Sequence, residues 1–218
     1  MIYDEPQKKS ARELSDEEIR HENDSRNTGT PSSPPIKVSD DSNSNEILVF
    51  TSHHNVYKVQ KREISDRFQA LGKIEFEEGE KPIYLTGEKN YSGFLIVAFE
   101  NGKIGKITMN SYSTEYNRKK LKNAFNNESK LIFIERIDND IDLVTLSSIN
   151  KVVLFNTGHI NPVGSRTTKG VQVMKQKSSS LMIKVKRAEH TKLIDPEYYR
   201  KNEGLNVVGY YLKQGDEI

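Results

Sequence analysis

The sequence contains no cysteine among its 218 residues. It therefore cannot form disulfides or use thiolate chemistry, and it lacks the usual ligands of structural zinc. Long hydrophobic runs are also missing, because no stretch approaches the roughly 18 apolar residues that span a bilayer. The N-terminal segment has no apolar core of the kind that a signal peptide requires. These absences predict a cytoplasmic protein without a membrane contact.

Motifs for bound cofactors are absent as well. No G-x-x-x-x-G-K-[ST] loop is present, so a nucleoside triphosphate would have to bind elsewhere in any complex. His53 and His54 are adjacent, so their side chains point apart, and the sequence fixes no acidic partner beside them. The stretch 138–142 is acidic but lacks the glycine and terminal glutamate of an EF-hand. We expect no metal and no cofactor.

Charge is distributed unevenly along the chain. Residues 1–45 carry ten acidic and six basic side chains, whereas residues 46–218 carry 27 basic and 21 acidic ones. A mildly basic part attached to an acidic one suits a polyanionic partner, although solvated lysines explain the same excess.

Composition separates the chain at the same point. Residues 1–45 have almost no aromatic side chains and contain two runs rich in Ser, Asn, Pro and Asp, at 27–35 and 40–45. Such a segment buries too little apolar surface to order itself. We predict a disordered acidic tail or linker over 1–45 and a folded domain over 46–218.

The folded part repeats itself at a constant spacing along the chain. The apolar run 47–50 recurs at 95–98 and 143–146, and the following run 55–59 recurs at 103–107 and 151–155. Each pair reads as a β-hairpin, and the dipeptide Asn101-Gly102 favours a type I′ turn. Further strands are expected at 81–86, 130–135 and 181–186, weaker ones at 73–77, 122–125 and 170–174, and a last one at 205–212.

These strands group into units of about 48 residues, a period typical of propellers and other repeat arrays. The expected units are 46–92, 93–140 and 141–188, with a partial unit over 189–218. Three to four such units, each with about four strands, fit a radial, propeller-like array better than a sandwich. The expected fold class is all-β.

Several segments carry a resemblance to a known family. Gly164 to Val171 reproduces, with one extra residue, a motif of the form G-R-x-x-x-G-V, and Leu212 to Glu217 matches a closing L-x-x-G-D-E segment. Residues 76–80 match that closing segment more loosely, and 47–59 resembles the opening of a repeat unit. Over 46–218 the chain resembles the C-terminal domain of the A subunit of DNA gyrase and topoisomerase IV. That resemblance implies a β-pinwheel whose basic rim binds and bends duplex DNA.

The sequence also departs from this family. The chain has room for three or nearly four blades, whereas family domains usually have five or six. The gyrase heptapeptide Q-R-R-G-G-R-G is absent, with only 63–68 in its place, and nothing before Glu46 can form a cleavage core with a nucleophilic tyrosine. The resemblance therefore implies a part of an ATP-dependent type IIA topoisomerase that is not catalytic on its own. It favours the topoisomerase IV type over gyrase-style supercoiling.

Basic residues at the repeat spacing are the candidate DNA contacts. Arg118 and Arg166 are one repeat apart, and Lys73 and Lys169 are two repeats apart, so each pair occupies equivalent positions. Lys58 and Lys106 are also equivalent, but they alternate with apolar residues and are expected on the solvent face of a strand. The predicted DNA-binding residues are Lys73, Arg67, Arg118, Lys119, Lys120, Lys122, Gly164, Arg166, Lys169 and Gly170.

The two glycines allow two interpretations. Each could let backbone N–H groups approach a phosphate, or simply form a tight turn.

The expected partners are duplex DNA, bound without sequence specificity at the nucleoid, and the catalytic core and ATPase subunit of a topoisomerase. Two alternatives stay open. A propeller could serve as a protein-interaction platform with an incidental basic rim, or the acidic tail could compete with DNA for that rim.

Overall fold

The computed structural model describes residues 37–38, 44–65, 68–115, 118–177 and 179–218. The chain divides into two compact units, 1–34 and 35–218, and all described residues belong to the second. Most of the predicted tail therefore lies outside the described residues. The pair Lys37–Val38, which the sequence places in that tail, forms a short strand, β1.

The described residues form mostly β-strands. The strands are β1 (Lys37–Val38), β2 (Glu46–Thr51), β3 (Val56–Gln60), β4 (Pro82–Glu88), β5 (Phe94–Phe99), β6 (Lys103–Thr108), β7 (Lys120–Leu121), β8 (Leu131–Ile137), β9 (Asp142–Ser147), β10 (Lys151–Asn156), β11 (Val171–Gln172), β12 (Met182–Arg187), β13 (Arg200–Lys201) and β14 (Tyr210–Tyr211). The helices are η1 (Lys61–Glu63), α2 (Gln69–Gly72), η2 (Met109–Tyr112), η3 (Thr157–His159), η4 (Ala188–His190) and α3 (Pro196–Tyr199). No helix in these ranges is long and apolar enough to span a membrane.

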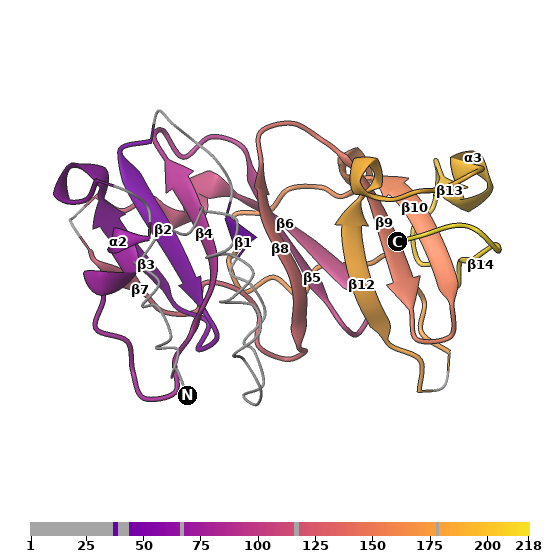
Figure 1. Cartoon of the computed structure of the whole chain (residues 1–218), viewed down its shortest axis with the longest axis horizontal. Helices are drawn as coiled ribbons and strands as arrows, with labels where there is room; N and C mark the ends of the chain where they lie inside the picture. The colour runs from indigo at the N-terminus through magenta and orange to yellow at the C-terminus, as the bar shows by residue number, and fades with distance from the viewer. Residues whose placement is uncertain (1–36, 39–43, 66–67, 116–117, 178) are drawn as a thin grey trace, which may run out of the picture. The chain divides into compact units, whose positions relative to one another are not determined.

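The strands form three sheets, which we call the first, second and third blades (Figure 1). The first has the order β1-β4-β2-β3-β7, the second β11-β6-β5-β8, and the third β12-β9-β10-β13, with β14 also paired to β10. The prediction of an all-β fold made of repeated hairpin sheets is confirmed. The strong apolar runs at the repeat spacing become the two central strands of every blade.

The weak strands are where the prediction and the structure differ. Residues 73–77, expected to be a strand, follow α2 as irregular chain. Ile74 and Phe76 pack on the outer face of the first blade, so this segment covers a sheet instead of extending it. The expected strand 205–212 is reduced to β14.

Each blade takes an edge strand from the unit that follows it in the chain. Leu121 of β7 pairs with Val56 of β3, and Val171 of β11 pairs with Ile104 of β6. Tyr210 of β14 pairs with the equivalent position of β10. The loops before and after these edge strands are therefore held against the preceding blade, and the segment 189–218 completes the edge of the third blade.

The hairpin turns keep one backbone conformation in all three blades. His54, Gly102 and Asn150, at equivalent positions of the repeat, have φ values of 59°, 81° and 56°. Asn101 is not among the described residues with positive φ, so the turn is not of type I′. It closes instead with a hydrogen bond from the Gly102 amide to the Phe99 carbonyl, 3.0 Å long. The predicted hairpin is confirmed, and its turn type was wrong.

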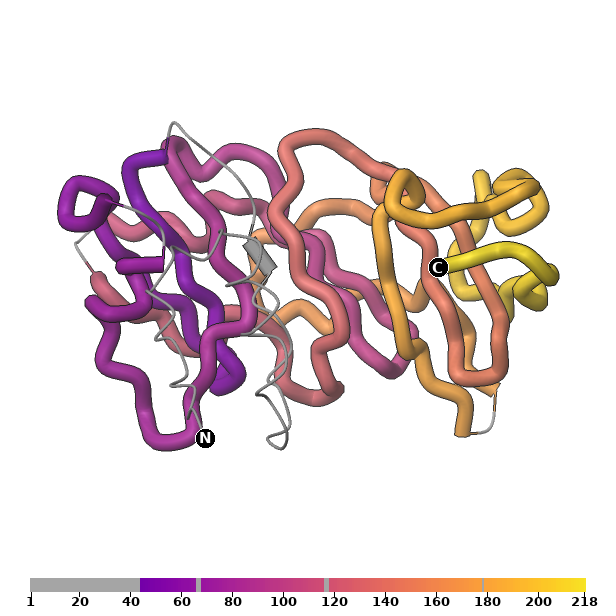
Figure 2. The backbone as a smooth tube through the Cα atoms, in the orientation of Figure 1, coloured from indigo at the N-terminus to yellow at the C-terminus, as the bar shows by residue number. Residues whose placement is uncertain are grey.

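The two largest core clusters lie between the blades, which follow one another in chain order (Figure 2). One cluster, including Phe50 and Tyr112, fills the space between the first and second blades. Another, including Phe133 and Phe155, fills the space between the second and third. Because both faces of the second blade are buried, its strands are apolar on both sides.

Candidate nucleic-acid interface

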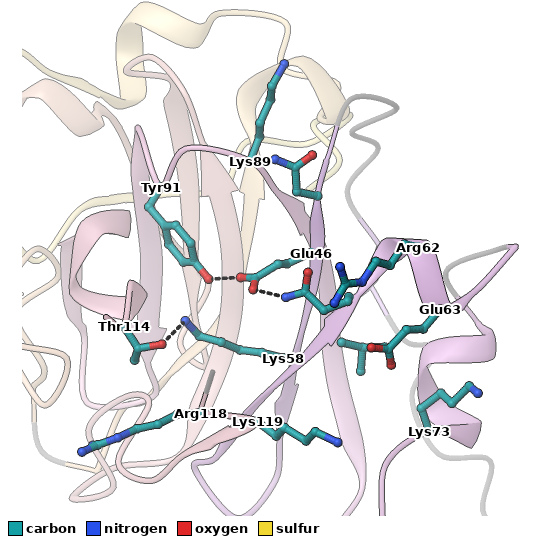
Figure 3. A pocket seen from close by; sticks show the side chains of 13 residues that line it. Glu46, Lys58, Arg62, Glu63, Lys73, Lys89, Tyr91, Thr114, Arg118 and Lys119 are labelled. Carbon is teal, nitrogen blue, oxygen red and sulfur yellow. Dashed lines mark hydrogen bonds between the residues drawn. The ribbon is translucent and has the colours of Figure 1, made fainter. Parts of the chain in front are cut away.

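A basic pocket of about 330 Å³ opens at one end of the first blade (Figure 3). It lies where β2 begins and β3 ends, opposite to the hairpin turn. Six basic side chains line it but only two acidic ones, Glu46 and Glu63. The six basic residues are Lys58, Arg62, Lys73, Lys89, Arg118 and Lys119.

Lys58 is the half-buried member of this group. Its position in β3 is fixed on both sides, by register with Leu48 of β2 and by its amide, which donates to the Lys119 carbonyl at 2.9 Å. Its ammonium donates to the Thr114 hydroxyl at 3.2 Å and lies 4.7 Å from the ring centroid of Tyr91. Lys58 thus reaches into the pocket between two neutral side chains (Figure 3).

The carboxylate of Glu46 is already bound. It accepts hydrogen bonds from the Tyr91 hydroxyl and the Gln60 side-chain amide, both from residues that line the pocket (Figure 3). Burial raises the pKa of Tyr91, and the carboxylate it faces raises it further, so the phenol stays protonated and donates. Glu46 therefore holds the wall of the pocket together.

The six basic side chains of the pocket form no ion pair within the part of the chain that the structure describes. Five of them are exposed and only Lys58 is half-buried. Burial lowers the pKa of Lys58, the charge of Glu46 opposes this effect, and the charge of Arg166 lowers the pKa further. The pocket is thus a concave surface with an excess of positive charge, which attracts anions and raises their local concentration.

Other predicted DNA contacts are paired with acids instead. The Lys120 ammonium lies 2.6 Å from a Glu77 oxygen, and the Lys169 ammonium lies 2.7 Å from a Glu128 oxygen. Burial alone would lower the pKa of Lys120, but its bonds to Glu77 and Tyr57 outweigh burial and raise the pKa to about 12. These two lysines have less free charge to offer than Arg118 and Lys119.

Arg166 holds a loop in place. Its Nη1 donates to the Ser111 carbonyl at 2.8 Å and its Nε to the Asn123 carbonyl at 3.4 Å. This explains locally why an arginine stands in the G-R-x-x-x-G-V-like segment. The side chain ties that segment to the second repeat unit.

Three other predicted residues that the structure describes, Gly164, Gly170 and Lys122, are not part of the pocket lining. Gly170 has a φ of 72°, and a Cβ there would lie 2.5 Å from the Ile104 carbonyl carbon, so this glycine permits a close approach to β6. Gly164 has no positive φ. Lys122 is exposed, and Arg67 lies outside the described residues.

Lys106 corrects the expectation that both strand lysines face solvent. It is only 3% exposed, and its ammonium lies 2.5 Å from an Asp140 oxygen. The sequence missed the roles of Lys58 and Lys89 in the pocket. The available signal was the repeat spacing of Lys58 and Lys106, which marks a structural position shared by two blades.

One acidic group lies beside His53, contrary to the sequence-based expectation. A Glu77 oxygen lies 3.4 Å from His53 Nδ1, and Glu80 completes a cluster whose possible ligand atoms are within 4.8 Å of one another. Glu80 already accepts from the Asn55 and Tyr57 side chains, both at 2.7 Å, from the Thr51 hydroxyl and from the Glu77 amide. Burial would raise the pKa of Glu80, but these bonds lower it to about 2. With its lone pairs occupied, Glu80 serves the fold of the first blade.

Comparisons with known proteins agree with this architecture. No protein-family model matches the chain. The A subunit of DNA topoisomerase 4 from Staphylococcus aureus is 23% identical over 146 residues, which are 63% of this chain and 18% of that protein. The chain thus spans less than a fifth of the length of that curated relative.

Solved structures give the fold. The C-terminal domain of DNA topoisomerase IV superposes with a TM-score of 0.62 at 15% identity, covering 80% of this chain and 61% of that one. The E. coli ParC C-terminal domain gives 0.60 at 12% identity, covering 81% and 79%. The DNA gyrase A C-terminal domain gives 0.53 at 16% identity, covering 79% and 61%. The resemblance inferred from the sequence is therefore confirmed, and the chain has the β-pinwheel fold of the C-terminal domains of DNA gyrase and topoisomerase IV A subunits.

Proposed function

We propose that this chain binds and bends duplex DNA without sequence specificity, as the accessory C-terminal part of a type IIA topoisomerase A subunit. The observation that carries the proposal is the basic pocket of the first blade, with six basic side chains and no ion pair among them in the described ranges. The shared fold with topoisomerase domains supplies the context.

The mechanism is electrostatic positioning. Each lysine or arginine that meets a backbone phosphate releases condensed counterions, and that release supplies most of non-specific affinity. Contacts of this kind fix the register of the duplex without reading its sequence. The exposed basic residues of the lining, Lys73, Lys89, Arg118 and Lys119, would make the first contacts.

The proposal assigns the chain no bond chemistry. Cleavage and ATP hydrolysis would belong to a catalytic core and an ATPase subunit, with this domain holding the DNA segment at the nucleoid. Arg67, Lys120, Lys122, Arg166, Lys169 and the glycines at 164 and 170 stay predicted secondary contacts.

The test is the affinity of the full chain for duplexes of about 20 and about 150 base pairs, the longer one near the persistence length of DNA, across a salt series. We expect tighter binding of the longer duplex and a linear fall of log affinity with log salt. If neither duplex binds at low salt, the proposal fails and the protein-interaction alternative takes its place.

A further inference from the structure

Lys58 and Lys106 provide an internal comparison between two equivalent positions. Each lysine lies in the second strand of its hairpin, and the two positions are one repeat apart. Lys58 is paired with Leu48, and Lys106 with Ile96. Because paired residues share a face of the sheet and Leu48 and Ile96 belong to the two interblade cores, each lysine faces the next blade. The ammonium of Lys106 has both an anionic and a neutral hydrogen-bond acceptor within the protein. It meets Asp140 at 2.5 Å and the Thr157 carbonyl at 3.4 Å.

Among the described residues, no carboxylate lies within ion-pair distance of Lys58. Tyr91 stands over its ammonium, at almost the same chain offset as Asp140 from Lys106, and the nearest hydrogen-bond partner is the neutral Thr114 hydroxyl. Burial lowers the pKa of Lys58, Arg166 lowers it further, and Glu46 and Glu88 oppose them. A partly buried charge without a counterion is costly, so an anion that reaches it gains more than it would at an exposed lysine.

We propose that Lys58 is the phosphate-binding lysine of this pocket, and that a phosphate group supplies the negative charge that Asp140 supplies to Lys106 in the next blade. The inference rests on the proposed function, because the DNA backbone is the phosphate source that this surface would meet. Lys58 is the anchoring residue because it is half-buried, whereas the other five basic side chains of the pocket are exposed.

The surroundings of Lys58 fit a phosphate group. Arg118 and Lys119 line the same pocket from the segment that precedes β7, and the amide of Lys58 fixes that segment through the Lys119 carbonyl. The two side chains extend in opposite directions from this segment (Figure 3). The Thr114 hydroxyl adds a neutral hydrogen-bonding group. Six basic side chains against two acidic ones line this concavity, and the Glu46 carboxylate there is already bonded to Tyr91 and Gln60. Charged donors with one hydroxyl bind phosphate by charge-assisted hydrogen bonds.

The test is an NMR titration of the ¹⁵N-labelled full chain with sodium pyrophosphate, at an ionic strength held constant with sodium chloride. We expect saturating shifts at the amides of Lys58, Thr114 and Lys119. In Lys58→Met the affinity should fall about tenfold, which corresponds to a loss of about 1.4 kcal/mol in binding free energy. Lys58→Arg should keep most of it. Lys81→Met, an exposed lysine at the turn end of the same blade, is the matched control and should bind like the wild type.

A second variant tests the same idea without removing the lysine. Thr114→Asp places a carboxylate next to the ammonium, so it should abolish pyrophosphate binding. Unchanged affinity in Lys58→Met or in Thr114→Asp would overturn the inference.

The same titration with a duplex of about 20 base pairs separates the inference from the proposed function. Pocket shifts with both pyrophosphate and duplex support both. Pocket shifts with pyrophosphate but none with duplex support a site for free phosphate compounds and contradict DNA binding. Duplex binding that leaves the pocket amides unshifted overturns the inference alone.

Discussion

Lys58 in the first blade and Lys106 in the second occupy the same place in the repeat, yet their surroundings differ. Lys106 is buried against Asp140, whereas Lys58 lines an open pocket with five further basic side chains. The neighbouring repeat positions differ in the same sense. The residues one repeat after Arg62 and Lys119 of the first blade are the neutral Asn110 and Thr167.

This difference shows how one repeat position can serve stability or binding. The strand and its register are the same in both blades, and what changes is the residue that faces the ammonium. A carboxylate there makes the lysine part of the core, and a neutral side chain leaves its charge available to a ligand. Substitutions at these positions should therefore have opposite consequences.

The largest expected effect comes from removing several pocket charges at once. In the variant Lys58→Met/Arg118→Ala/Lys119→Ala, affinity for a long duplex at low salt should fall about 100-fold. The slope of log affinity against log salt should flatten by about 2.7, or about 0.9 for each lost phosphate contact. Fluorescence anisotropy across a salt series measures both. The control Lys81→Met/Lys130→Met removes exposed charges near the turn ends of two blades and should change the affinity far less. An equal loss in the control would mean that overall charge, and not the pocket, governs binding.

The second effect concerns stability. Lys106→Met leaves Asp140 without its ion-pair partner and should lower the free energy of unfolding by about 2 kcal/mol. This value is below the roughly 3–5 kcal/mol expected for a fully buried pair because Asp140 is partly exposed. Lys58→Met removes a charge that has no ion-pair partner among the described residues and should leave the free energy of unfolding within about 0.5 kcal/mol of the wild type. Urea denaturation of the two variants checks this comparison, and equal destabilisation would refute it.

Single exposed lysines should give a smaller difference. Lys119→Ala removes an unpaired charge from the pocket, so duplex affinity should fall about threefold. Lys169→Ala removes a charge already shared with Glu128 and should have an effect below about twofold, because an exposed ion pair is worth little by itself. If Lys169→Ala loses more duplex affinity than Lys119→Ala, the DNA interface lies at the G-R-x-x-x-G-V-like loop and not at the pocket.

The smallest expected effect is the contribution of Asp140 to the pH dependence of stability. Burial would raise the pKa of Asp140, but hydrogen bonds from Lys106 and Thr157 hold it below its usual range. A carboxylate with a lowered pKa in the folded state stabilises above its ordinary value near 3.8, and this stability is lost as the pH falls through the folded value. Acidification from pH 6 to about pH 3 should therefore cost the wild type and Lys58→Met equally and Asp140→Asn less. Denaturation at several pH values measures this, and identical pH profiles for all three proteins would contradict it.

The strong strands could be read from the sequence, whereas the weak ones could not. The runs beginning at Ile47, Leu95 and Leu143 are apolar at nearly every position, because both faces of the central strands are buried, and their constant spacing fixes the repeat. Ile74 and Phe76 alternate like a strand, but they use their apolar side chains to cover the first blade. An alternating apolar pattern in the sequence does not distinguish a strand that pairs at the edge of a sheet from a segment that packs on the face of a sheet.

The candidate site was only partly predictable for a similar reason. Arg118 and Lys73 were expected from their repeat positions and Lys119 from its place beside Arg118 in a basic loop, and all three line the pocket. The partners of Lys120 and Lys169, however, are glutamates that belong to the preceding repeat unit in each case. Which lysines keep a free charge depends on these distant contacts, and so does the different surrounding of Lys58 and Lys106.

The measurement that tests the central claim most directly is the affinity of Lys58→Met and Lys106→Met for a duplex of about 20 base pairs, in one salt series with the wild type. Both variants are to be measured at a temperature where circular dichroism shows them folded. We predict that Lys58→Met binds about tenfold more weakly with a salt slope smaller by about 0.9, and that Lys106→Met binds like the wild type. Equal affinities for the two variants would contradict the account.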